Sequence, residues 1–138
     1  MEQATFSFQK YSVENFTFST ENMVHEDISI KIDPSGKFIT DKRIFLLNFN
    51  FYAFGKESGF EKSFVTCKMN AEFVFSHDIK TVDDIPSYFY ANSIAIVFPY
   101  LRSFISSLTI QANLKPFILP TMNLSSLSTP LKENIVVE

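Results

Sequence analysis

Apolar and polar residues alternate along the first half of the chain, which is the pattern of half-buried β-strands. Two pairs of phenylalanines, within residues 6–8 and 16–18, alternate with polar residues, whereas Tyr11 and Val13 between them have the opposite parity. A bulge between the two pairs would let one strand change face, because it inserts one extra residue. The pattern therefore predicts a first strand over residues 5–19.

Three further strands are predicted. Isoleucines alternate with polar residues over residues 28–32, and the next four, Asp33 to Gly36, are typical of a turn. Pro presets one turn position, and Gly tolerates positive φ. Residues 44–54 and 60–75 predict two long strands, joined by a hairpin at the glycines of residues 55–59. Apolar residues occupy the odd positions of the last strand, so its odd face should receive a helix.

One long helical pattern follows a polar linker over residues 77–86. Asn92 or Ser93 is expected to cap this helix, because a short side-chain oxygen there accepts a bond from an unpaired backbone N–H. Pro99 is expected to kink the helix or restart it, and Thr109 falls on a polar face. The apolar stripe, predicted to form the helix core or an oligomer interface, consists of Ile94, Val97, Leu101, Phe104, Ile105 and Leu108.

An apolar loop comes after the helix. Pro116 and Pro120 prevent further helix, yet most of residues 117–124 are apolar. Such a loop must lie against the protein's own core, a partner subunit or a bound polypeptide, and the pattern leaves these open. Residues 128–138 are expected to be frayed. The prediction is one α+β domain over residues 1–138: a four-stranded antiparallel sheet followed by a long helix packed on one face, without a full second C-terminal helix.

Composition indicates a globular protein. Hydrophobic residues make up 46% of the chain and charged residues 20%. The 17 Phe and 5 Tyr fit a β-rich core and an adhesive binding site equally well. A net charge of −3, with no long block of one sign, argues against a primary nucleic-acid or anionic-membrane partner. The longest apolar run, residues 94–101, is shorter than the roughly 20 residues that span a bilayer, and no secretory signal is seen. A cytoplasmic location is therefore expected.

No residue pattern indicates catalytic, cofactor or metal chemistry. His25 and His77 lie on different elements, without ligand partners at useful spacing. Cys67 alternates with apolar residues on a strand, which is typical of an inert buried thiol. With 3 glycines, the chain has no glycine-rich phosphate loop. The protein is expected not to be an enzyme and to use no cofactor.

Motifs along the helix and the loop point to a family. Residues 96–102 read IVFPYLR, residues 105–108 read ISSL, and residues 119–124 read LPTMNL. With the Phe-rich first strand and FVTC at residues 64–67, this order resembles the bacterial protein-export chaperone SecB, whose helix contains an F-P-Y-x-R motif before a Pro-rich loop. The resemblance covers nearly the whole chain. It implies a dimer of dimers and an ATP-independent holdase that wraps unfolded preproteins along apolar grooves.

The resemblance also suggests which residues meet an unfolded client. Apolar contact is non-directional and adaptable, so a groove of this kind need not read the client's sequence. The predicted groove residues are Phe16, Phe18, Met23, Val24, Tyr88, Phe89, Tyr90, Phe117, Ile118, Leu119, Met122 and Leu124.

One family feature is not reproduced. In SecB proteins, acidic residues on the first and fourth strands help contact the translocase motor SecA. The aligned positions here are Asn15, Ser19 and Lys68. The resemblance therefore implies client holding more firmly than hand-off to SecA. Some SecB-like proteins instead serve toxin–antitoxin systems, where they protect one aggregation-prone antitoxin.

Alternatives to a general export holdase stay open. They are a SecB-like chaperone dedicated to one partner such as an antitoxin, a small-ligand-binding or enzymatic α+β domain, and a structural oligomer. The ligand-binding alternative lacks a convergent polar constellation. A homo-oligomer is expected because bare apolar sheet faces would be adhesive. The apolar residues predicted to point away from the odd face are Ile44, Leu46, Tyr52, Phe54 and Phe64.

Overall fold

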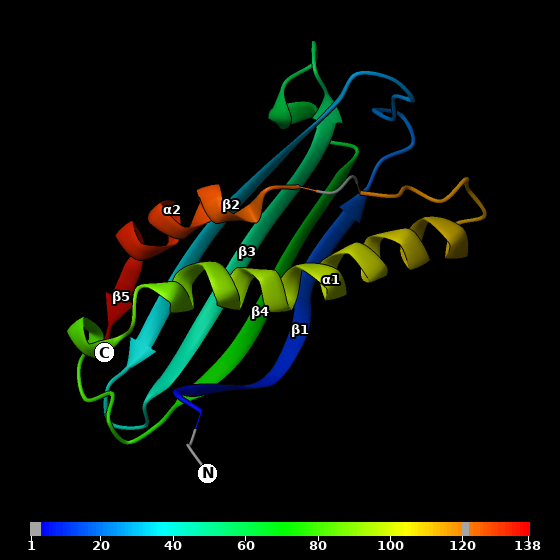
Figure 1. Cartoon of the computed structure of the whole chain (residues 1–138). Helices are drawn as coiled ribbons and strands as arrows, with labels where there is room; N and C mark the ends of the chain where they lie inside the picture. The colour runs from blue at the N-terminus through cyan, green and yellow to red at the C-terminus, as the bar shows by residue number, and fades with distance from the viewer. Residues whose placement is uncertain (1–3, 120–121) are drawn as a thin grey trace.

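One sheet forms the centre of the computed structural model, which describes residues 4–119 and 122–138 (Figure 1). Its four long strands are β1 (Phe6–Phe18), β2 (Ile28–Ile39), β3 (Ile44–Gly55) and β4 (Val65–Phe75). They lie in the order β1-β4-β3-β2, and each is antiparallel to its neighbours. The predicted α+β class, with antiparallel strands and a long helix, is confirmed.

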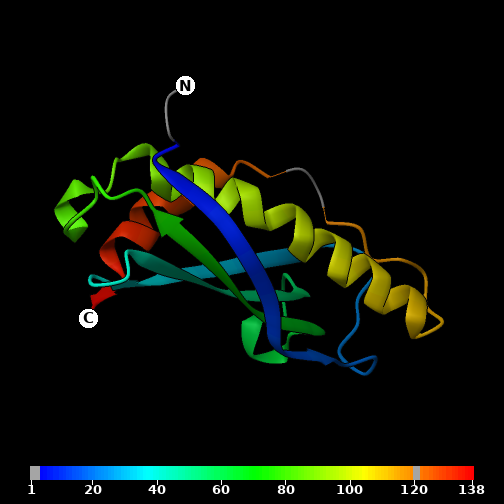
Figure 2. The same cartoon turned by 90° about the horizontal axis from the view of Figure 1, so that it is seen from below.

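One long helix, α1 (Tyr88–Gln111), covers one face of this sheet (Figures 1 and 2). Short 3-10 helices occur at Phe60–Lys62, Val82–Asp84 and Leu124–Leu127. By length and composition α1 could cross a membrane. Its buried side chains, however, include Ile94, Val97 and Leu101, which belong to the core, so the helix is accounted for as a core helix.

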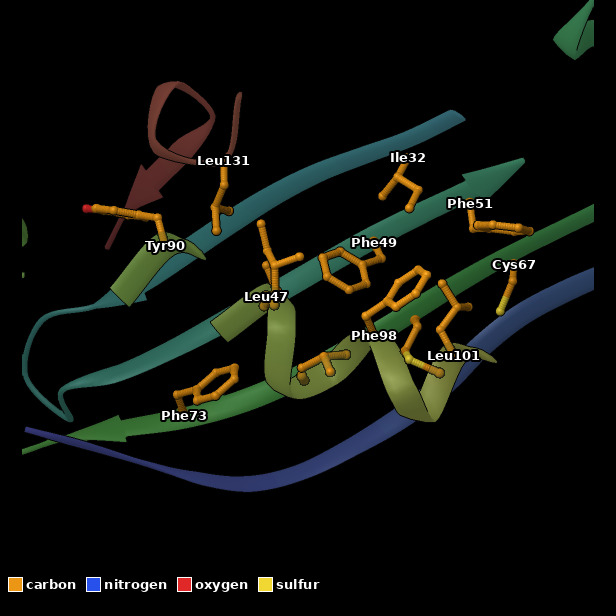
Figure 3. Close-up of a cluster of buried hydrophobic side chains, with 14 of the residues drawn as sticks. Ile32, Leu47, Phe49, Phe51, Cys67, Phe73, Tyr90, Phe98, Leu101 and Leu131 are labelled. Carbon is orange, nitrogen blue, oxygen red and sulfur yellow. The ribbon is translucent and has the colours of Figure 1, made fainter. Parts of the chain in front are cut away.

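Alternation on the central strands builds the core between sheet and helix. The odd residues of β3 and β4 and the even residues of the second half of β2 are buried. Figure 3 shows Leu47, Phe49 and Phe51 of β3 together with Phe98 and Leu101 of α1 in this layer. The odd face of β4 therefore receives the helix, as predicted.

Two bulges give β1 a single apolar face. The register with β4 shifts between Phe8 and Lys10 and again between Val13 and Asn15. Each inserted residue exchanges the parity of those that follow. All the apolar residues of the strand therefore pair with odd, helix-facing residues of β4; these are Phe6, Phe8, Tyr11, Val13, Phe16 and Phe18. The predicted irregularity is confirmed, but it keeps the apolar face constant instead of changing it.

The predicted turn at residues 33–36 is wrong, because β2 runs through it. Pro34 is tolerated since its ring nitrogen faces the outer side of β2. The N–H of Gly36, two residues on, points to that side and donates to the Asn134 carbonyl at 2.9 Å. Pro34 therefore removes no hydrogen bond to β3. Gly36 is needed because a Cβ there would lie 2.3 Å from the Cζ atom of Phe45.

Helix α1 begins at Tyr88, before the predicted cap at Asn92. Pro86 precedes the first turn, and its carbonyl accepts a hydrogen bond from the Phe89 N–H at 3.0 Å. Tertiary contacts fix this start, since Phe89 is fully buried among rings from β1, β3 and β4. Pro99 neither stops nor restarts the helix, and its side chain is exposed.

The C-terminal residues 128–138 are folded, which corrects the prediction of a frayed tail. Helix α2 (Ser128–Glu133) buries Leu131 completely, and β5 (Ile135–Val137) pairs parallel to residues 36–38 of β2. Glu138 extends this pairing through a backbone bond from the Thr40 N–H at 2.9 Å. The sheet therefore has five strands. The second helix is a short one, as predicted.

The face of the sheet opposite α1 carries part of the predicted set of outward apolar residues. Ile44, Leu46, Tyr52 and Phe54 lie on this face and are half-buried, as predicted. Phe64 does not belong there, because it is fully buried and its ring packs edge-to-face on Phe117 at a centroid distance of 5.4 Å. That placement corrects the prediction for Phe64.

Candidate functional site

The end of α1 directs the apolar loop. Asn113 adopts a left-handed conformation (φ 61), and its N–H donates to the Ile110 carbonyl at 2.9 Å. The Leu114 N–H donates to the Thr109 carbonyl at 3.0 Å. These two bonds form a Schellman motif, in which a left-handed residue ends a helix. The chain then turns back toward the connection between β1 and β2 (Figure 1).

Thr109 ties the loop to the helix. Its side chain is fully buried, which corrects its assignment to the polar face. The hydroxyl donates to the Ser106 carbonyl at 2.8 Å and accepts a hydrogen bond from the Phe117 N–H at 2.9 Å. Both roles of this buried hydroxyl are therefore satisfied. The sequence offers no local signal for this contact, because the helix cap brings the two residues together.

Core and surface residues alternate along the 115–119 segment of the loop. Phe117 is half-buried over Phe64, and Leu119 is only 2% exposed, whereas Ile118 is 72% exposed. Leu119 therefore belongs to the core, which corrects its prediction as a groove residue. Met122 and Leu124 are half-buried against the core. Burial thus assigns Leu119 to the core, and a groove role for the other residues of the loop stays a prediction; Pro120 and Thr121 lie outside the described residues.

An apolar hollow of about 170 Å³ lies between the loop and the β1–β2 connection. Its walls are largely aliphatic and aromatic, and basic side chains stand at its margin. We call this site the apolar hollow; its lining residues are Met23, Val24, His25, Ile28, Lys115, Pro116 and Phe117. The structure thus brings together Met23, Val24 and Phe117 of the predicted groove. Sequence reasoning missed His25, Ile28 and Lys115.

The predicted aromatic cluster at the start of α1 lies far from the apolar hollow. Most of the length of the 24-residue helix, which is roughly 36 Å long at 1.5 Å per residue, lies between the two sites. Phe89 and Tyr90 are buried in the core, which corrects their prediction as groove residues, and Tyr88 is exposed. Phe16 is exposed on β1 with its ring against Phe104.

Four of the six residues of the apolar stripe of α1 face the sheet. Ile94, Val97, Leu101 and Ile105 are at most 1% exposed and belong to the core, so for them the helix-core alternative holds. Phe104 and Leu108 are half-buried at the side of the helix.

Groups with catalytic potential are scattered or inert. Burial raises the pKa of the Cys67 thiol to about 11, so it stays protonated at neutral pH and is a poor nucleophile. His25 and His77 are exposed. Across residues 4–119 and 122–138, no group of three or more His, Cys, Asp or Glu could hold a metal ion. The described part of the chain thus offers apolar surface rather than reactive groups.

The five-stranded sheet with one long helix across it defines the class of the fold, which is that of SecB-like chaperones. The SecB-like chaperone Rv1957 of Mycobacterium tuberculosis, solved in complex with a ChAD peptide from the Rv1956 HigA1 antitoxin, matches it with a TM-score of 0.65. The match covers 86% of this chain and 91% of that chain at 12% sequence identity. A likeness at this identity establishes the fold.

Sequence comparison adds a distant relative. The uncharacterized protein MJ0357 of Methanocaldococcus jannaschii is 26% identical over 143 residues, covering 95% of this chain and 87% of that protein. No protein-family model matches the sequence. The structural match thus confirms the resemblance to SecB at the level of fold.

Proposed function

We propose that this protein is an ATP-independent cytoplasmic chaperone that holds unfolded polypeptide at the apolar hollow and the adjoining 115–119 segment. One observation carries the proposal: Thr109 and Phe64 fix an apolar loop so that Ile118 stays exposed beside the apolar hollow. Leaving a side chain of this size in water is unfavourable by about 1.5–3 kcal/mol relative to burial. A bound client would recover that free energy.

The fixed loop suits transient binding. Pro116 restricts the backbone, and the hydrogen bond from the Phe117 N–H to Thr109 anchors it. Little conformational entropy remains to be lost when a client docks. Met23, on the opposite wall, has an unbranched side chain that adapts to different client shapes.

A client that is one dedicated partner is the second candidate. The Rv1957 chaperone, which has the same fold, was solved with a peptide from an antitoxin. This complex favours one aggregation-prone partner, such as an antitoxin, over the full range of export clients. SecA is not proposed as a partner. Lys68 occupies one of the positions that are acidic in SecB, and it pairs with Glu14 at 3.5 Å, so the surface there is mixed in charge.

An aggregation assay tests this function. The purified protein should suppress aggregation of a denatured substrate without nucleotide. Ile118→Ser should weaken client binding by about 1.5–3 kcal/mol, the value of one buried aliphatic side chain, and leave the melting temperature unchanged because Ile118 is exposed. Val136→Ser is the matched control, since Val136 is also exposed, at 61%, but lies on β5. Wild-type client affinity in the Ile118→Ser variant would reject the apolar loop as the binding surface.

We further propose that two copies pair through β1. This strand ends the sheet, so its outer backbone groups are available to another chain. Its sequence is self-complementary about Ser12: antiparallel pairing of two copies centred there places each Lys10 opposite the other copy's Glu14. The same pairing sets Phe8 opposite Phe16. Tyr11 and Phe16 are exposed along this edge and would be covered.

Charge reversal tests the pairing. Lys10→Glu should raise the dimer dissociation constant roughly tenfold or more, because two pairs per dimer change from attraction to repulsion. Sedimentation equilibrium at low salt measures this constant, and Lys56→Glu, in the β3–β4 connection, is the control with the same charge change. A monomeric wild type at micromolar concentration, or equal constants for the two variants, would reject pairing through β1.

A further inference from the structure

Charged side chains occur around the apolar hollow, and those that line it differ from those that neighbour it. Glu26 and Asp27, between the lining residues His25 and Ile28, are exposed but do not line the apolar hollow. Two titratable side chains line it, His25 and Lys115; both are exposed and both are basic types. The ion pairs found among the described residues involve Lys31, Lys37, Lys68 and His77, so neither lining residue is paired there with a carboxylate of this chain.

The size of the apolar hollow limits what can fill it. Its volume is about 170 Å³, close to that of an apolar cavity of about 150 Å³ that holds one benzene molecule. One aromatic ring or one large aliphatic side chain therefore fills it. A client would insert one anchor side chain and lie extended across the margin.

Resting on the function proposed above, we infer that the apolar hollow selects unfolded segments in which a bulky apolar residue has an acidic residue two positions away. In an extended chain, residues two positions apart point to the same side. When the anchor points into the apolar hollow, an acidic residue two positions away also faces the protein and lies at the margin. Lys115 reaches it there with a long, flexible side chain.

The net charge of the protein would by itself disfavour acidic clients. The whole chain carries −3, and its long-range field would repel a negatively charged segment. Selection by Lys115 is local, because exposed charges are screened beyond about 8–10 Å at physiological salt. The position of the acid relative to the anchor therefore matters, and the client's total charge does not.

Matched peptides separate these effects. Short fluorescent Ser- and Gly-rich peptides with one central Phe carry an Asp two positions from the Phe, the same Asp moved to the peptide end, or Asn in its place. Anisotropy should give roughly 2–5-fold tighter binding for the first peptide, the range of one exposed ion pair. The advantage should vanish in Lys115→Gln, reverse in Lys115→Glu, and persist in the control Lys42→Gln, because Lys42 is exposed in the turn between β2 and β3 at the other end of the sheet.

The outcomes distinguish the inference from the function on which it rests. If all peptides bind with equal affinity, the inference is rejected and the holdase function stands. If the peptide with Asp at its end binds as tightly as the peptide with Asp two positions from the Phe, the peptide's net charge and not Lys115 sets the preference. That result also rejects the inference. If no peptide binds and the wild type does not suppress aggregation either, the function itself is rejected.

Discussion

Leu101→Asp should leave the protein unfolded at room temperature. Leu101 is 0% exposed in the middle of α1, where it lies in the layer between helix and sheet (Figure 3). The buried polar side chains among the described residues are Ser93 and Thr109, so the core offers no cation to pair with a carboxylate at this position. An unpaired carboxylate there costs several kcal/mol, comparable with the 5–15 kcal/mol that is the total stability of an ordinary domain.

The control for this variant keeps the volume and removes the charge. Leu101→Met should cost less than about 1.5 kcal/mol, because a volume-conserving apolar exchange repacks with little strain. Circular dichroism melting curves of both variants measure the difference. A cooperative transition at the wild-type temperature in Leu101→Asp would show that this side of α1 does not face the core.

The second large effect is expected at Phe89, the centre of the aromatic cluster. Its ring lies 4.9 Å from Phe6, 5.0 Å from Phe45 and 4.7 Å from Phe75, between ring centroids, and thus joins α1 to three strands. Phe89→Ala should lower the free energy of unfolding by about 3–5 kcal/mol, because the cavity cannot close when its walls belong to separate elements. Urea denaturation measures this change.

The neighbouring residue supplies the comparison for Phe89. Tyr88 belongs to the same turn but is 50% exposed, so Tyr88→Ala should change stability by less than about 1 kcal/mol. Similar losses in the two variants would contradict the central role of the cluster. A shift of the helix start in Phe89→Ala, seen by hydrogen exchange at Phe89 to Ser93, would show that packing and not capping fixes the first turn.

Sequence predicts the buried face of an element where apolar and polar residues alternate regularly along it. The apolar parity of β4 and the buried part of the stripe of α1 follow from local pattern, and the structure agrees with them. Strand β3 is apolar on both parities, so its local pattern alone does not say which face is buried. The turn at residues 33–36 could not be rejected from sequence. Pro34 is harmless only because its nitrogen faces outward, and Gly36 serves Phe45, which lies on another strand.

Part of the apolar lining of the candidate site was predicted, whereas Ile28 and the residues defined by tertiary contact were missed. Met23, Val24 and Phe117 are recognisable from type and setting alone. Thr109 and Lys115 acquire their roles only when the helix cap folds the loop back onto the β1–β2 connection. Tyr90 and Leu119 show the converse, since the sequence marks them as apolar but does not reveal that the core already contains them.

The small strand β5 limits how far the sheet can extend from one copy of the protein to the next. A sheet that grows without limit into a fibre needs two open edges, one to add to and one to present. At β2 the protein's own C-terminus takes part of that edge, through residues 36–38 and Thr40, and Pro34 withholds a donor from the stretch beside it. Pairing through β1 would use up the other edge, so each end of the paired sheet would present only the edge of β2, shortened by β5 and by Pro34.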